Sequence, residues 1–226
     1  MPANLLLRAA AGCAALACLA APTRADPSPN TLVTHPLVVE VVATPGATLL
    51  DFAGPAEAFG LLTGHAVEYV VSDDTKPFKL ENGVVVSPDY SFEEAPKPDI
   101  VIIGSQPAKG SDEAMTWLRR VHARGGTIMS VCTGADWLGQ SGLLNGLEAT
   151  THHNAIESYR AKYRAVKFVS GKRYVESEPR LFTAGGYTAG LDLALHIVDV
   201  RYGRPTASEV ARRLEYPGTG WMTNKW

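Results

Sequence analysis

Short runs of β-branched and aliphatic residues alternate along the chain with longer stretches of helical character. Runs of this kind, bounded by turn residues, are typical of strands. They predict strands at residues 37–42, 67–71, 84–86, 99–103, 127–131, 147–151 and 181–183. The stretches between them predict helices over 54–62 and 187–202, one from Ser111 to Gly125, one ending at Ser141, one opening at Asn154, and one from Thr206 to Pro217.

Several predicted helices carry signals at their first turn. Ser111 precedes Asp112 and Glu113, which is the pattern of a capped N-terminus with favourable acidic charge. The residue pairs 154/157 and 206/209 have the spacing of a capping box, in which two side chains satisfy backbone amides reciprocally. These signals predict where three helices begin.

The order of these elements predicts the fold class. Strands that alternate with helices indicate an α/β domain of three layers with a mostly parallel central sheet. Residues 99–103 are apolar on both faces, as expected for a central strand covered by helices on each side. In open sheets of this kind, ligands bind beyond the carboxyl ends of the strands, so candidate chemistry is sought there.

The first 25 residues have the layout of a secretory signal peptide. A short start with one positive charge precedes an unbroken apolar run at 9–21, and Thr23-Arg24-Ala25 supplies small residues for cleavage. Thirteen apolar residues fall short of the about 20 that a membrane-spanning helix needs. We therefore predict a signal peptide at 1–25, a linker at 26–36 and a protein exported to the periplasm or beyond, with no membrane attachment after cleavage.

Composition narrows the function classes. The chain of 226 residues is 46% hydrophobic and 19% charged, an ordinary globular mixture. A formal net charge of −2 provides no basic surface for nucleic acid, so we expect no nucleic-acid partner. Of the three cysteines, Cys13 and Cys18 would leave with the signal peptide, and the mature protein would keep Cys132 alone.

Cys132 lies where a strand runs into a helix. Its neighbours Ser130 and Gly134 are small, which is the arrangement of a nucleophile elbow: a tight turn that holds a reactive side chain over the sheet. A helix N-terminus favours the thiolate, and the Thr133 amide could donate to an oxyanion. The alternative is an inert buried cysteine.

Other polar or glycine residues also follow predicted strands. Asp51 follows the first strand among apolar neighbours, and burial beside a thiol would raise its pKa and make it a general acid. Its alternative role is to cap the helix before Gly54-Pro55. Four further residues, at strand ends, are candidate oxyanion or substrate-pocket residues: Ser105, Gln106, His152 and Gly186.

The sequence offers little support for a metal or cofactor. His152 and His153 are adjacent and would point to opposite faces of a strand, so we predict no metal site. His196 follows Asp192 by four residues, which suggests a structural contact. The segment 185–190 lacks the glycine spacing of a dinucleotide loop, and we expect close backbone packing there instead.

Taken together, these motifs resemble the ThiJ/PfpI superfamily, relatives of the class I glutamine amidotransferases. The resemblance spans about residues 37–216 and leaves 217–226 as a C-terminal tail. It rests on the segments 51–55, 130–135, 142–152 and 183–192. Within the superfamily, the chain is most similar to isonitrile hydratases and to the sensor domains of AraC-type regulators.

The resemblance implies a flavodoxin-like sandwich that forms a homodimer, and a small-molecule substrate with no cofactor. In isonitrile hydratases a cysteine attacks the isocyanide carbon, an aspartate handles protons and the following threonine assists. These roles fall on Cys132, Asp51 and Thr133, and the product would be an N-substituted formamide. We therefore expect a cysteine-dependent lyase that hydrates a small electrophile.

Two departures from the superfamily pattern affect this expectation. Protease-type members place histidine after the cysteine, whereas this chain has Thr133, which argues against peptidase activity. The loop after the central strand usually reads Pro-Gly-Gly, and here Gly104-Ser105-Gln106 replaces it, so Gln106 could offer a side-chain donor instead. Two alternatives stay open: ligand binding without turnover, with no DNA-binding module after the domain, and redox or carbonyl-stress protection through Cys132.

Overall fold

The computed structural model describes residues 36–62 and 66–225. The predicted signal peptide and all of the predicted linker except Pro36 lie outside the described residues. Within the described ranges, no helix combines the length and the hydropathy needed to cross a membrane.

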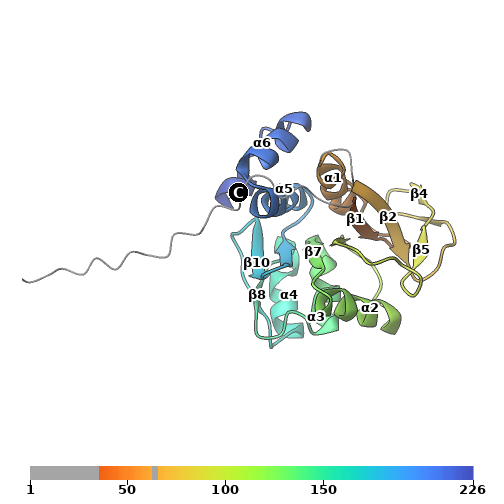
Figure 1. The fold of residues 1–226 in the computed structure, drawn as a ribbon. Helices are drawn as coiled ribbons and strands as arrows, with labels where there is room; N and C mark the ends of the chain where they lie inside the picture. The colour runs from red at the N-terminus through yellow and green to blue at the C-terminus, as the bar shows by residue number, and fades with distance from the viewer. Residues whose placement is uncertain (1–35, 63–65, 226) are drawn as a thin grey trace, which may run out of the picture.

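A seven-stranded sheet forms the centre of the described structure, with strands in the order β10-β11-β7-β6-β1-β2-β5 (Figure 1). Neighbouring strands run parallel except β10 and β11, which pair antiparallel. These strands are β1 (Leu37–Val42), β2 (Ala66–Ser72), β5 (Tyr90–Ser91), β6 (Ile100–Ile103), β7 (Thr127–Val131), β10 (Tyr174–Glu178) and β11 (Leu181–Ala184). The predicted mostly parallel α/β sheet is confirmed.

The order of the strands determines where a site can form. The chain passes from β1 to β2 on one side and then crosses to β6, β7 and β11 on the other. The carboxyl ends of β1 and β6 therefore lie at the point where the direction of winding reverses, and loops separate there to leave a crevice.

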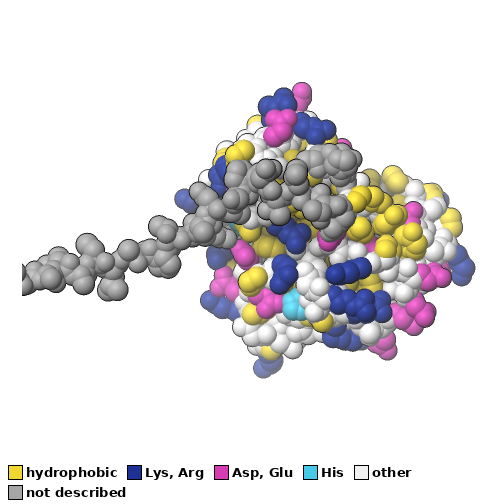
Figure 2. Space-filling model, viewed as in Figure 1, with side chains coloured by type: hydrophobic (Ala, Val, Ile, Leu, Met, Phe, Trp, Pro, Cys, Tyr) yellow, Lys and Arg dark blue, Asp and Glu magenta, His cyan; other side chains and the backbone are white. Residues whose placement is uncertain are grey.

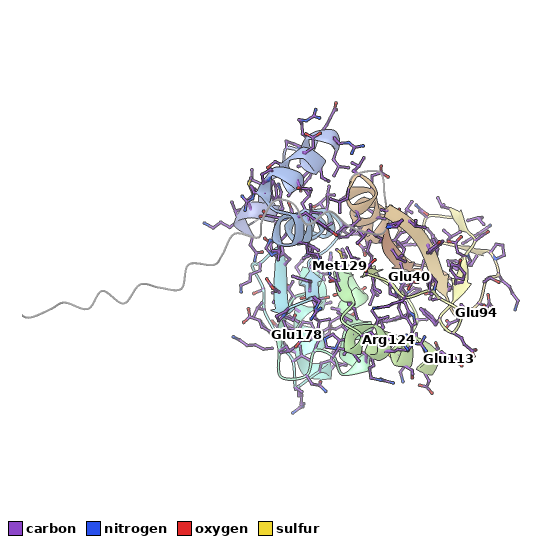
Figure 3. The ribbon with its side chains drawn as sticks, viewed as in Figure 1. Glu40, Glu94, Glu113, Arg124, Met129 and Glu178 are labelled. Atoms are coloured by element: carbon purple, nitrogen blue, oxygen red, sulfur yellow. The ribbon has the colours of Figure 1, made fainter. Side chains whose placement is uncertain are left out.

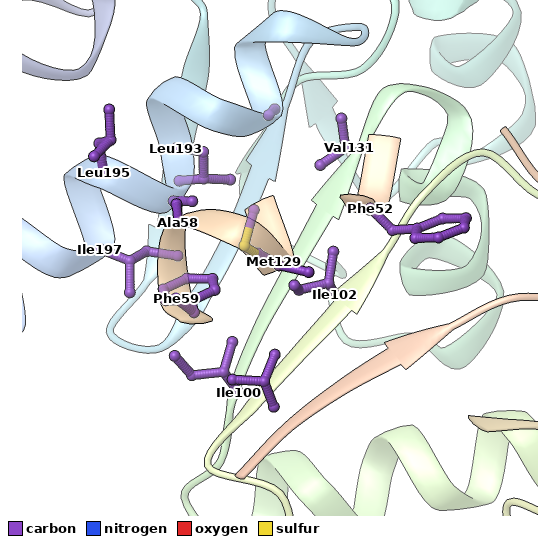
Figure 4. Packing of buried hydrophobic residues seen from close by; sticks show 14 of the residues in the cluster. Phe52, Ala58, Phe59, Ile100, Ile102, Met129, Val131, Leu193, Leu195 and Ile197 are labelled. Atoms are coloured by element: carbon purple, nitrogen blue, oxygen red, sulfur yellow. The ribbon is translucent and has the colours of Figure 1, made fainter. Parts of the chain in front are cut away.

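Helices cover both faces of the sheet (Figure 1). One face carries α1 (Leu49–Gly60), α5 (Thr188–Tyr202) and α6 (Arg204–Arg213), and the other carries α2 (Asp112–Ala123), α3 (Ala135–Ser141) and α4 (Ile156–Lys162). On the first face, Met129 and Ile102 of the sheet pack between Phe59 of α1 and Leu193 of α5 (Figure 4). A second cluster, including Trp117 and Leu138, fills the opposite face.

Several sequence predictions match the structure closely. All four residues of β6 are buried, as expected for a strand that is apolar on both faces. The hydroxyl of Ser111 accepts a hydrogen bond from the Ala114 amide at 3.1 Å, so the predicted cap of α2 is confirmed. Trp137, in α3 just after the elbow, is buried and donates its indole N–H to the Ala108 carbonyl at 3.0 Å.

Helix α1 begins five residues earlier than the predicted start at Gly54. A Gly-Pro pair is typical of a helix start because proline is favoured in the first turn, but the structure has Pro55 inside α1 rather than at its beginning. Asp51 consequently lies inside the first turn of α1 with Thr48 at the N-cap position, and the alternative that Asp51 caps a later helix is wrong.

Other predicted elements differ in their pairing or their ends. The predicted strand at 147–151 is only β8 (Glu148–Ala149), which pairs with β9 (Lys167–Phe168) outside the main sheet. The hairpin β3 (Phe78–Lys79) and β4 (Val85–Val86) is also separate. Neither predicted capping box forms: α4 and α6 have no side-chain cap, and the Thr206 hydroxyl donates to the Tyr202 carbonyl instead.

The described part of the predicted C-terminal tail packs onto the domain. Helix α7 (Gly220–Thr223) buries Trp221, whose carbonyl accepts a hydrogen bond from the Tyr174 hydroxyl at 2.8 Å. The side-chain amide of Asn224 accepts from the Tyr174 amide and donates to the Tyr174 carbonyl, both at 3.0 Å. The segment therefore lies against β10 as part of the fold.

The expected contact between His196 and Asp192 does not form. Asp192 pairs with Arg173, and His196 stacks on the ring of Tyr174 with centroids 4.5 Å apart. Arg173, just before β10, and Tyr174, the first residue of β10, thus take the place of the contact expected within the helix.

Candidate active site

The loops at the carboxyl edge of the sheet bring together residues that are far apart in the sequence. Asp51 enters from α1 after β1, Ser105 follows β6, and Cys132 follows β7. The loop after β11 contributes Gly186 and Tyr187. This meeting point at the β1/β6 crossover is the candidate active site.

Cys132 occupies the strained turn predicted from its neighbours. Its φ of 58° lies in the left-handed region, which non-glycine residues rarely adopt. The turn is held by backbone and hydroxyl partners: the Cys132 amide donates to the Gly185 carbonyl at 2.8 Å, and the Thr151 hydroxyl donates to the Cys132 carbonyl at 2.7 Å. The strand β7 therefore delivers the sulfur into the crevice through a fixed elbow.

Gly134 lets the elbow lie against the loop after β6. A Cβ at this position would come within 2.6 Å of the Gly104 carbonyl oxygen and closer still to that of Ile103. No side chain fits in that space, so the small residue in the elbow motif is required by a close backbone approach.

Asp51 is fully buried, and two backbone amides hold its carboxyl group in place. The Ser105 amide donates to Oδ2 at 2.9 Å, and the Tyr187 amide donates to Oδ1 at 3.1 Å. The carboxyl group also lies beside the Cys132 side chain, and this interaction lowers the pKa of Asp51. Burial raises the pKa of Asp51 by more than these hydrogen bonds lower it, as the sequence predicted for an acid that carries a proton.

Cys132 is buried beside this carboxyl group, with 6% of its surface exposed. Burial, followed by the charge of Asp51, raises the pKa of the thiol to about 12. The prediction of a resting thiolate at a helix N-terminus is therefore wrong, because desolvation and a neighbouring carboxylate outweigh the local dipoles. The alternative of an inert buried cysteine agrees with this burial and this raised pKa, and it stays open.

Thr133 and Ser105 line the site beside the sulfur. The amide and hydroxyl of Thr133 both act on the Cys132 thiol to lower its pKa. The Ser105 and Thr133 hydroxyl oxygens lie 2.6 Å apart, and the Thr133 carbonyl accepts from the Tyr159 hydroxyl at 3.2 Å. Predicted pocket residues from two different loops are thus brought into contact.

Gln106 supports the loop rather than the sulfur. Its amide nitrogen donates to the Val42 and Gly104 carbonyls at 3.0 and 3.3 Å. Its side-chain oxygen accepts from the amide and hydroxyl of Thr44 at 3.0 and 2.8 Å. Both amide hydrogens are engaged, so Gln106 has none free for an oxyanion, and the role expected from the unusual loop sequence has to be corrected.

His152 lies at the rim of the site against Gly186. A Cβ at Gly186 would come within 2.5 Å of the imidazole Cδ2, so glycine is what allows the ring to lie there. The Asn154 amide donates to the ring Nδ1 at 3.3 Å, and burial lowers the pKa of His152, which favours the neutral ring.

His152 and His153 do not take opposite sides, because they lie in a turn rather than in a strand. Their ring centroids are 4.3 Å apart. Among the described residues, no three His, Cys, Asp or Glu side chains gather in a way that could hold a metal ion.

Three residues of the site were not singled out from the sequence. Tyr187 supplies an amide to Asp51, while the Thr151 and Tyr159 hydroxyls hold the two carbonyls of the elbow. The only signal for Tyr187 was its place directly after the Gly185-Gly186 pair. The two hydroxyls belong to a segment outside the main sheet and donate hydrogen bonds to backbone carbonyls of the elbow. No local sequence pattern indicates such contacts.

Comparison with known proteins gives one family. The family model described as DJ-1/PfpI matches residues 38–200. The isonitrile hydratase of Pseudomonas putida is 32% identical over 176 residues, which cover 76% of this chain and 75% of that protein. The crystal structure of a ThiJ/PfpI family protein from Pseudomonas syringae matches with a TM-score of 0.69 and 27% identity, covering 90% of this chain and 85% of that one.

A transcriptional regulator is similar to the same part of the chain. The HTH-type regulator CdhR of Pseudomonas aeruginosa is 31% identical over 177 residues, which cover 75% of this chain and 52% of the regulator. This chain thus matches about half the length of that relative.

Proposed function

Because the chain belongs to the DJ-1/PfpI family, we propose that its buried thiol and carboxyl pair hydrates small isonitriles to N-substituted formamides. The observation that carries the proposal is the contact between Cys132 and Asp51, two groups whose pKa values are both raised. Similarity to the isonitrile hydratase of Pseudomonas putida supports the choice of electrophile.

The first step needs both an acid and a nucleophile at one carbon atom. Asp51 gives its proton to the terminal carbon of the isonitrile, and the Cys132 sulfur adds to the same carbon. The thiol proton passes to Asp51, which ends the step protonated as it began. A C–S bond and a C–H bond form, the triple bond becomes a C=N bond, and the product is a thioimidate on Cys132.

The second step consumes one water molecule. Its oxygen adds to the thioimidate carbon, and one of its protons reaches the nitrogen with Asp51 as the carrier. The C–S bond then breaks as the C=O bond forms, and the hydroxyl proton returns to the sulfur. The products are the N-substituted formamide and the free Cys132 thiol.

The geometry of the pair suits this chemistry better than it suits acyl transfer. The Ser105 amide, from the loop that could complete an oxyanion hole, donates to Asp51 instead. In the proposed reaction, protons move to carbon and nitrogen, so positioning the acid matters more than stabilising an oxyanion. A thiol that loses its proton only as the substrate reacts also matches the raised pKa of Cys132.

The direct test is to incubate the purified protein with cyclohexyl isocyanide and follow formation of the formamide. We expect turnover by the wild type, no turnover by Cys132→Ala, and a loss of about 100-fold or more in kcat for Asp51→Asn. Glu113→Gln, a change on the exposed part of α2, serves as the control. Turnover that survives Cys132→Ala would exclude the mechanism.

Similarity to a regulator supports a second candidate function, ligand binding without turnover. In that case, isonitriles or related small molecules would raise the melting temperature of the protein while no formamide appears. Melting curves with and without cyclohexyl isocyanide, run beside the product assay, separate the two functions.

Protection against oxidants or reactive carbonyls through Cys132 has less support. Oxidation follows thiolate character and exposure, and this thiol is buried with a raised pKa. Measuring the mass of Cys132 peptides after treatment with peroxide or methylglyoxal tests this alternative.

We also propose that the protein is exported, on the pattern of residues 1–25. Expression of the full chain in a bacterium should then yield a mature protein that begins at Asp26 in the periplasmic fraction. N-terminal sequencing checks this, and a protein that retains its first residues in the cytoplasm would contradict it.

A homodimer is the proposed oligomeric state. Hydrophobic side chains gather on the surface beside β2 and β4 (Figure 2). Val84, Val85 and Leu50 are 44%, 59% and 49% exposed, and a hydrogen bond of 2.9 Å from Thr48 to Glu81 joins the segments that carry them. Light scattering should give twice the mass of the chain for the wild type and a smaller mass for Val85→Glu.

A further inference from the structure

Tyr187 has a backbone position fixed by the site and a side chain that the proposed mechanism does not use. Its amide donates to Asp51, and its carbonyl accepts from the Gly190 amide at 3.0 Å. Its φ of 52° and ψ of −104° lie outside the regions that an aromatic residue prefers. Glycine would adopt this conformation without strain. The chain therefore carries an aromatic side chain at a position where the backbone conformation favours glycine.

The side chain of Tyr187 is partly open to solvent at the edge of the site, where its own backbone amide contacts Asp51. It is 45% exposed, whereas Asp51 and Cys132 are 0% and 6% exposed. The ring meets His152 edge to face, with centroids 6.2 Å apart. The charge of Cys132 is the largest of the influences that raise the pKa of the phenol, followed by burial, Asp51 and Glu81. The phenol therefore stays protonated at neutral pH and can donate a hydrogen bond.

His152 is less able to regulate access than Tyr187. The imidazole is held between the backbone of Gly186 and the amide of Asn154. Tyr187, by contrast, has a large exposed fraction, and its hydroxyl makes no hydrogen bond to another described residue. Its hydroxyl can therefore serve an incoming molecule.

We propose that Tyr187 is a specificity-determining residue, whose ring restricts the width of molecules that reach Cys132 and whose hydroxyl donates a hydrogen bond to them. The inference rests on the proposed function for its substrate class: slender isonitriles with a neutral hydrogen-bond acceptor, such as an ester, near the isonitrile group. Anionic substituents near the phenol are disfavoured because the negative charge of Glu81 acts on the Tyr187 hydroxyl and raises its pKa.

The restriction on width can be tested without turnover. Cys132 is alkylated with iodoacetamide or with the wider N-phenylmaleimide, and mass spectrometry follows the peptide that carries Cys132. The variant Tyr187→Gly keeps the hydrogen bond from the backbone amide to Asp51. In this variant we expect the maleimide rate to rise by about tenfold or more relative to the iodoacetamide rate. Equal acceleration of both reagents, or of neither, would overturn the proposal.

A matched control separates loss of the ring from relief of backbone strain. Glu215 also has a positive φ, of 49°, and lies after α6, away from the site. Glu215→Gly should leave the ratio of the two alkylation rates unchanged. Melting curves and circular dichroism of Tyr187→Gly and Tyr187→Phe establish that both variants are folded, and Tyr187→Phe should keep the wild-type ratio because it keeps the ring.

The hydrogen bond is tested by turnover of methyl isocyanoacetate and of n-propyl isocyanide, which has no acceptor. Tyr187→Phe should raise KM for the ester by about tenfold relative to the propyl compound. An unchanged ratio of KM values would overturn the role of the hydroxyl. If neither compound is turned over by the wild type, the proposed function fails, while the alkylation ratio still decides whether Tyr187 restricts access.

Discussion

At the scale of single residues, the central feature is a thiol and a carboxyl group that share a buried site. Burial raises the pKa of both groups, and the charge of Asp51 raises the pKa of the Cys132 thiol further, whereas the interaction with Cys132 lowers the pKa of Asp51. The Cys132 thiol therefore keeps its proton at neutral pH, and chemistry at the sulfur must begin by moving that proton. A cysteine of this kind depends on its partner acid more than a preformed thiolate would.

The first prediction concerns the pH dependence of Cys132. The raised pKa keeps the thiol protonated below about pH 12, so alkylation by iodoacetamide should still be rising above pH 8.5, the midpoint of a free thiol. Asp51→Asn removes the neighbouring charge and should move the midpoint to lower pH. A wild-type midpoint at or below 8.5, measured by the rate of Cys132 labelling, would contradict this view of the pair.

Single residues of the site differed in how far the sequence revealed them. Cys132 and Asp51 were predicted because a small-residue turn and an acid among apolar residues are local patterns. The predicted role of Gln106 was wrong, since three of its four hydrogen bonds reach residues 62 or 64 positions away and the fourth lies within its own loop. Tyr187 was missed because it acts through its backbone amide, which donates a hydrogen bond to the carboxyl group of Asp51, 136 positions away.

At the scale of helices and strands, the predictions succeeded where hydrophobic pattern and turn residues agreed. The ranges of β1 and β7 were predicted to the residue, and α5 to within one residue. Failures occurred where tertiary contacts decided the outcome: 147–151 pairs outside the main sheet, and two capping boxes never form. The start of α1 was missed because Pro55, a residue typical of a first turn, lies inside this helix.

The second prediction concerns the docking of α7. Asn224 makes two hydrogen bonds to the backbone of Tyr174, and its φ of 53° is one that glycine adopts easily. Asn224→Gly therefore removes the two bonds without adding strain and should lower the free energy of unfolding by about 1–2 kcal/mol. Urea unfolding measures this, and an unchanged stability would mean that α7 docks through Trp221 alone.

At the scale of the whole molecule, one buried carboxylic acid links the stability of the fold to pH. Glu40 lies on β1 inside the fold (Figure 3), with no exposed surface and no hydrogen bond to either carboxyl oxygen among the described residues. Burial raises its pKa to about 8, and the charge of Arg120 opposes this shift only in part. The protonated acid is the form that the core accommodates.

The third prediction follows from this shift. Between pH 4.5 and about 8, the folded protein holds a proton at Glu40 that the unfolded chain has lost, so stability falls as pH rises. The slope should approach about 1.4 kcal/mol per pH unit. Glu40→Gln should flatten the profile over this window, and Glu40→Leu should raise the melting temperature at pH 8.

Glu113→Gln on the exposed part of α2 provides the control for Glu40. It should keep the wild-type dependence on pH, as measured by melting temperatures from pH 5 to 9. A wild-type profile without a downward slope would show that Glu40 is ionised in the folded state.

The contact between Asn224 and β10 has a further consequence for solubility. β10 is the last strand of the sheet, and the Tyr174 amide and carbonyl that face away from β11 would otherwise be open to a strand from another molecule. The side-chain amide of Asn224 presents one donor and one acceptor in the manner of a peptide group, and so it ends the ladder of hydrogen bonds. The same residue that fastens the C-terminal segment thus protects the sheet against edge-to-edge aggregation.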